Sequence, residues 1–98
     1  MAIIFDIGDT VWAEARFLDD AGRPVDPEAI RFSVRLPSLD VDGPIEHPHE
    51  RIERLTTGVF LFRIDPPTVG TYTVQCLGVT LLGAFVETQR FVIQESFF

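Results

Sequence analysis

The chain has 98 residues, 46% hydrophobic and 23% charged, which is the composition of one folded domain with a modest core. Its net charge of -7 argues against a nucleic-acid partner, because binding a phosphate backbone requires clustered Lys or Arg. A single cysteine excludes an internal disulfide, and no stretch approaches the ~20 apolar residues of a membrane helix. The first residues lack the basic and apolar regions of a secretory signal, so we expect synthesis in the cytoplasm without membrane attachment.

Hydrophobic and polar residues alternate along five segments, which predicts half-buried β-strands. In the first, TVWAEARFL at 10–18, Val11 and Phe17 share one face while Trp12 takes the polar face with Glu14 and Arg16. The others are IRFSVRL at 30–36, VFLFRI at 59–64, TYTVQCLG at 71–78 and VETQRFVI at 86–93. The segment EHPHERIERL at 46–55 fits either a helical turn or a polar edge strand, and Pro48 favours the strand.

Turn-forming residues separate these segments at regular intervals. DDAGRP at 19–24 offers Gly22 for a positive φ, and the Asp-Pro pair at 26–27 predicts a corner. DVDGP at 40–44, TTG at 56–58 and DPPTVG at 65–70 break the chain again. Short strands with such punctuation and no helical stretch predict an all-β sandwich or barrel.

Several turn and core residues together form a pattern that covers the chain except for residues 38–50. They are Gly8, Asp9 and Val11; Asp19, Gly22, Asp26 and Pro27; Thr57, Gly58, Val59 and Phe60; Gly70, Thr71 and Tyr72; and Phe91 with Ile93. In this pattern the chain resembles small immunoglobulin-like proteins encoded among the structural genes of tailed phages and prophages, although Val69 stands where a proline is usual. The resemblance implies a single antiparallel immunoglobulin-like β-sandwich of about seven strands over residues 1–98, and a role as a head decoration, neck or tail accessory protein.

Three groups of residues have the composition of chemical sites, and for each we favour a structural role. His47, His49 and Glu50 lack the further ligands that a zinc site needs. Asp40 and Asp42 begin a calcium-loop pattern that Pro44 interrupts, so they are expected to bond to backbone groups in a turn. Cys76 is in phase with core residues and has no base near it in sequence, so it is expected to be a buried thiol. We therefore predict no enzyme activity, no catalytic residue, no metal and no cofactor.

Apolar residues where polar ones are expected suggest a docking role. The predicted turn at 80–85 contains Leu81, Leu82 and Phe85, and the chain ends in an apolar tail, Phe97 and Phe98. Each residue, if buried in a partner, would contribute roughly 1.5–3 kcal/mol, and Trp12 is a further candidate. The turn residues could instead cap the sandwich end, Trp12 could pack at a sheet end, and the two terminal residues could fray.

The sequence therefore predicts a non-enzymatic virion protein whose partners are other capsid, neck or tail subunits, with copies of itself included in a symmetric assembly. The alternative is an immunoglobulin-like module that binds a host surface or a carbohydrate.

Overall fold

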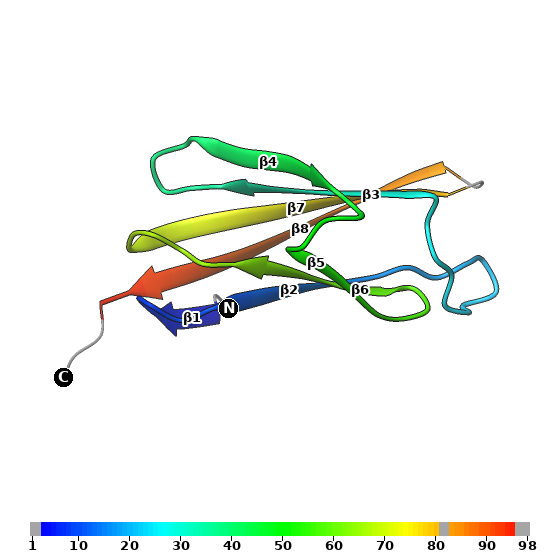
Figure 1. The fold of residues 1–98 in the computed structure, drawn as a ribbon, viewed down its shortest axis with the longest axis horizontal. Helices are drawn as coiled ribbons and strands as arrows, with labels where there is room; N and C mark the ends of the chain where they lie inside the picture. The colour runs from blue at the N-terminus through cyan, green and yellow to red at the C-terminus, as the bar shows by residue number, and fades with distance from the viewer. Residues whose placement is uncertain (1–2, 81–82, 96–98) are drawn as a thin grey trace.

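The computed structural model describes residues 3–80 and 83–95, which form an all-β sandwich (Figure 1). Eight strands are present in this part of the chain. They are β1 (Ile3–Asp6), β2 (Val11–Arg16), β3 (Ala29–Arg35), β4 (Val41–Glu46), β5 (Ile52–Thr56), β6 (Val59–Ile64), β7 (Gly70–Thr80) and β8 (Gly83–Gln94). None of the described residues forms a helix that is long and apolar enough to cross a membrane.

The strands form two sheets, one with the order β1-β8-β7-β3-β4 and the other with the order β2-β6-β5. This arrangement confirms the predicted sandwich, and its strand order is that of an immunoglobulin-like domain. Two details differ from the expectation. There are eight strands where about seven were expected, and the β1–β8 pair is parallel in an otherwise antiparallel fold. The sequence did not reveal β1, because four residues are too short a segment for alternation to be recognised.

The break expected at 40–44 was wrong, since this segment lies largely inside β4. Gly43 and Pro44 occur within this edge strand, where its pairing with β3 shifts in register between Phe32 and Val34. A β-bulge at an edge accommodates both residues, because Pro44 needs no ladder partner for its missing N–H. The 46–55 segment contains no helix, and its second half is the edge strand β5, as the polar pattern predicted.

The core forms where the predicted alternation places apolar side chains on the inner faces of both sheets. The buried residues include Val11, Ala13, Ala15, Phe17, Ile30, Phe32, Val34, Phe60, Phe62, Ile64, Tyr72, Val74, Cys76, Phe91 and Ile93. At its centre the ring of Phe32 on β3 stacks on the ring of Phe62 on β6, with centroids 4.7 Å apart and planes inclined by 10°. This stack joins the two sheets.

Residues of the turn and core pattern make contacts that hold this fold. Asp19 accepts hydrogen bonds from the N–H groups of Ala21 and Arg23, both at 2.9 Å. The Tyr72 hydroxyl donates to the Thr68 carbonyl at 2.7 Å, which forms the tyrosine corner of an immunoglobulin-like sandwich. These contacts explain why the pattern specifies the architecture.

Asp26 joins two loops that are distant in sequence. It accepts a hydrogen bond from the Gly58 N–H at 2.8 Å and another from Arg54 Nε at 3.1 Å. Both bonds favour the ionised carboxylate, so they hold the pKa of Asp26 below its ordinary value. Gly58 is required here, since its φ is 74° and a Cβ would lie 2.6 Å from the Phe17 carbonyl oxygen.

Candidate protein-docking surface

The structure describes only part of the set of residues predicted to dock on a partner. Leu81, Leu82, Phe97 and Phe98 lie outside the described residues, as does the side chain of Phe85. The turn expected at 80–85 was wrong for four of its residues, because β7 continues to Thr80 and β8 begins at Gly83. β8 runs for twelve residues, roughly 40 Å, from one end of the sandwich to the other (Figure 1). The two ends of β8 therefore belong to different surfaces.

Trp12 lies near the end of the molecule where β8 finishes. It is 47% exposed and stands opposite Arg63 on the outer face of the three-stranded sheet. The neighbouring Thr10 Oγ1 donates to Asp65 Oδ1 at 2.8 Å, which ties the start of β2 to the end of β6. The structure thus separates Trp12 from the start of β8.

The turn between β3 and β4 displays a leucine that the sequence pattern did not single out. Leu39 has a φ of 73° and a side chain that is 75% exposed. Its N–H donates to the Leu36 carbonyl, and the Leu36 N–H donates to the Asp40 carbonyl, both at 2.9 Å. A left-handed conformation costs a residue with a Cβ roughly 1–2 kcal/mol, so the turn holds an apolar side chain in water at the expense of stability.

Leu39 borders an open depression of about 420 Å³ on the outer face of the five-stranded sheet. Its lining consists of Arg35, Leu36, Pro37, Leu39, Thr71 and Thr73. The close packing of the turn depends on Gly70, because a Cβ at this position would lie 2.7 Å from Pro37. We call these lining residues, with the exposed Val41 beside them, the Leu39 surface.

A smaller depression of about 180 Å³, lined mostly by polar residue types, continues from the Leu39 surface across the same sheet. It is lined by Ser33, Arg35, Val41, Thr73, Gln75 and Thr88. Arg35 and Arg90 stand on either side of Thr73 in one cross-strand row. This face therefore carries positive charge and hydroxyl groups in a chain whose net charge is -7.

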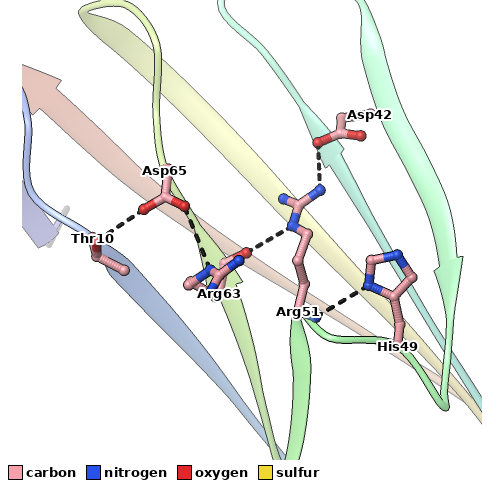
Figure 2. Close-up of polar contacts among 6 residues, drawn as sticks. All are labelled: Thr10, Asp42, His49, Arg51, Arg63 and Asp65. Carbon is pink, nitrogen blue, oxygen red and sulfur yellow. Dashed lines mark hydrogen bonds and ion pairs between the residues drawn. The ribbon is translucent and has the colours of Figure 1, made fainter.

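Arg51 holds the strand that carries Val41 against the other sheet (Figure 2). Its Nη1 donates to Asp42 on β4 at 3.0 Å, and its Nε donates to the Arg63 carbonyl on β6 at 3.1 Å. The guanidinium also lies over the ring of Phe62, 4.7 Å from its centroid. Arg51 therefore bridges the two sheets at the open side between β4 and β5.

A second group of polar contacts continues this bridge toward β2 (Figure 2). Arg63 Nε is buried and lies 3.5 Å from Asp65 Oδ2, too far for a good hydrogen bond but close enough for an ion pair. The other carboxylate oxygen of Asp65 accepts the bond from Thr10. The polar residues at this place serve to hold strands together.

The residues considered for chemistry make structural contacts. The His47 ring meets the edge of Phe60 at a centroid distance of 5.4 Å, and His49 Nδ1 accepts the Arg51 N–H at 3.1 Å. The Asp40 carboxylate accepts a hydrogen bond from Ser38 Oγ at 3.1 Å, and that of Asp42, on β4, accepts one from Arg51 Nη1 at 3.0 Å. The expectation that both carboxylates bond to backbone groups in a turn was therefore wrong. Within residues 3–80 and 83–95, no group of three or more His, Cys, Asp or Glu is placed to hold a metal ion.

Cys76 is buried, as predicted from its position in the alternating pattern of its strand. Burial, and to a smaller extent the neighbouring carboxylate of Glu87, raises the pKa of its thiol to about 12. The thiolate, which is the reactive form, is therefore scarce at neutral pH.

Compared with family models, with curated proteins and with solved structures, the chain gives no match.

Proposed function

We propose that this chain is a non-enzymatic structural or accessory subunit that docks on a neighbouring protein through the Leu39 surface. The observation that carries the proposal is the exposed leucine held at a φ of 73° beside a depression of about 420 Å³. Asn, Asp or Gly would adopt that conformation at lower cost, so stability does not explain a leucine here. Strain of this kind is typical of functional sites.

The energetics suit a docking site. Full burial of a leucine side chain stabilises a complex by roughly 1.5–3 kcal/mol, and Leu39 is 75% exposed in the free chain. The turn is already ordered by its own hydrogen bonds, which lowers the entropy lost on binding. Val41 extends the apolar area, and Arg35 supplies a charged group at the rim.

The setting that we propose is a tailed-phage particle, and the support for it is the resemblance of the turn and core pattern. The partners would be capsid, neck or tail subunits, with head decoration and neck assembly as the leading positions. The protein would be made in the host cytoplasm, where its net charge of -7 favours solubility before assembly. Many copies on a symmetric particle would allow modest contacts to add by avidity.

The proposal is tested with Leu39→Asn in the genome that encodes the chain. Asparagine tolerates a positive φ, so we expect unchanged or slightly higher stability together with fewer copies per purified particle, measured by quantitative mass spectrometry. Leu55→Asn is the matched control, since Leu55 is 60% exposed on β5 and lies outside the Leu39 surface. If particles made with the unsubstituted gene do not contain the chain, the virion role is contradicted. If the Leu39→Asn variant is incorporated at full copy number, the docking site is contradicted.

The C-terminal residues give a second test of docking. Removing Phe97 and Phe98 should lower incorporation into particles while the free protein still folds. If the shortened chain has a normal circular dichroism spectrum and is incorporated into particles in normal copy number, the tail takes no part in docking.

A second candidate function is carbohydrate or host-surface binding, which the smaller depression favours. Its hydroxyl and amide side chains, those of Ser33, Thr73, Gln75 and Thr88, are the groups that bind sugar hydroxyls, and its volume is about 180 Å³. This function predicts that the isolated chain binds glycans or cells and that Gln75→Ala weakens the binding. A glycan array on which the isolated chain gives no signal would count against it.

A further inference from the structure

The β8 strand has a partner along its length on one side but along only part of it on the other. β7 pairs with β8 without a register shift from Gly83 to Ile93. β1 pairs with the opposite edge only from Phe91 to Gln94. Within the described part of the chain, that edge is therefore open from Gly83 to Arg90.

The backbone of this open stretch is directed outward at alternate residues. The Ile7 N–H donates to the Gln94 carbonyl at 2.8 Å, so the backbone groups of Gln94 point away from β7. In an antiparallel ladder this direction alternates along the strand, so the even-numbered residues of β8 present their N–H and C=O groups at the open edge. These residues are Ala84, Val86, Thr88 and Arg90.

The other described edges carry features that block the addition of a strand. β4 contains Pro44 and a register shift, and β5 has five residues and a register shift of its own. β1 has four residues. On β2, the Glu14 carbonyl accepts a hydrogen bond from Gln89 Nε2 at 2.8 Å, which covers the middle of that edge. Proteins protect edges in these ways against pairing. On β8 the Gln89 side chain reaches β2 only near the end of the open stretch, and from Gly83 to Thr88 the strand has no proline and no register shift, so this part of the edge is a site for pairing.

We propose that the open edge of β8 pairs with the same edge of a second copy of this chain, antiparallel and about a two-fold axis. The two-fold axis passes between the Val86 residues of the two copies, and Ala84 of each copy pairs with Thr88 of the other. Val86 is 61% exposed in the single chain, and its pairing with Val86 of the second copy shields both side chains from water. Each pair of even-numbered residues exchanges backbone hydrogen bonds across the axis, and the two five-stranded sheets become one.

Charge and space select this register. Moving the axis to Glu87 would place the two Glu87 carboxylates directly opposite each other, which is destabilising. Moving it to Thr88 would extend the pairing to Phe91 of the second copy, where β1 already occupies the edge. With the axis at Val86, Glu87 stands opposite Phe85 of the second copy, so no like charges face each other.

This self-pairing goes beyond the proposed docking role and uses another part of the molecule. The Leu39 surface lies at the β3–β4 turn, whereas the paired edge lies toward the start of β8 at the other end of the sandwich (Figure 1). If either proposal fails its test, the other is unaffected, because docking through the Leu39 surface and pairing of β8 are tested with different substitutions and different measurements.

The test is the oligomeric state of the full chain, measured by light scattering behind size exclusion over a concentration series. We expect the unsubstituted chain to form a dimer. Val86→Glu and Val86→Lys should each raise the dimer dissociation constant by about tenfold or more, because each places like charges opposite each other in place of two valines. An equal mixture of the two variants should recover the dimer, since opposite charges then meet at the axis.

Two further variants separate the pairing of the β8 edge from the effect of an added surface charge. Leu55→Glu adds the same charge to an exposed position on β5 and should leave the dimer intact. Thr88→Pro removes an N–H that points away from β7, so the β7–β8 ladder remains while the pairing is lost. The proposal is overturned by an unsubstituted chain that stays monomeric throughout the series, by a dimer that survives Val86→Glu, or by a Glu/Lys mixture that does not pair.

Discussion

Replacing Arg51 tests the bridge between the two sheets, and the structure gives the size of the effect. Its Nε bond to the Arg63 carbonyl is partly buried and contributes about 1 kcal/mol. The ion pair with Asp42, whose side chain is 48% exposed, contributes about 0.5 kcal/mol. The contact with the Phe62 ring adds about 1 kcal/mol.

These contributions predict that Arg51→Ala lowers the free energy of unfolding by roughly 2–3 kcal/mol, since the contacts share one side chain. For a domain of this size, the corresponding fall in Tm is roughly 10–20 °C. Arg51→Lys keeps the charge but loses the planar guanidinium, so we expect about half of that loss. Asp42→Asn removes only the ion pair and should cost about 0.5 kcal/mol.

Urea unfolding followed by circular dichroism measures these values, with the m-value checked for each variant. The Asp42→Asn/Arg51→Ala double mutant gives the coupling energy of the pair, which we expect to be about 0.5 kcal/mol. An Arg51→Ala protein within about 0.5 kcal/mol of the unsubstituted chain would show that Arg51 does not hold the sheets together.

Three further predictions concern single sites. A thiol reagent should leave Cys76 unmodified in the folded protein at neutral pH and modify it rapidly in denaturant, because burial raises its pKa to about 12; rapid labelling of folded protein would contradict this. The folded-state pKa of Asp26 lies below its ordinary value of 3.8, so its carboxylate stabilises the fold above about pH 4, and this contribution is lost as the pH falls through the folded pKa. The stability gap between Asp26→Asn and the unsubstituted chain should therefore narrow below about pH 4 in urea titrations, and a gap that does not change with pH would contradict the assignment. Gly78→Ala should cost about 1–3 kcal/mol in the same assay, because its Cβ would overlap the Phe17 ring, and an unchanged midpoint would show that the ring moves freely aside.

The strands that were predicted correctly are those in which both residue types alternate over six or more positions. On β3, for example, Ile30, Phe32 and Val34 are buried as their phase required. The strand β1 was missed because its partner, β8, is almost the whole chain away in sequence, and the four residues of β1 show no pattern that would predict this pairing. β4 was obscured by Gly43 and Pro44, which signal a turn in sequence but form a bulge at an edge.

The predicted docking residues were chosen because apolar groups stood in expected turns, and the same rule should have selected Leu39. It was overlooked because its neighbours Ser38 and Asp40 make the segment look like an ordinary polar turn. The close packing beside Leu39 depends on Gly70 and Pro37, which meet only in the folded chain. That contact is long-range, so local sequence carries no signal for it.

Which side chains face the core, and where most of the turns lie, could be read from the chain alone, because alternation and turn residues act over a few neighbouring positions. Which strands are edges, which edge remains open and which apolar side chains stay in water became clear only in the folded molecule. Those properties follow from the pairing of distant segments. Among the described residues, β1 covers four residues of β8 and leaves that edge unpaired from Gly83 to Arg90, and this outcome arises from where β1 meets β8 in space.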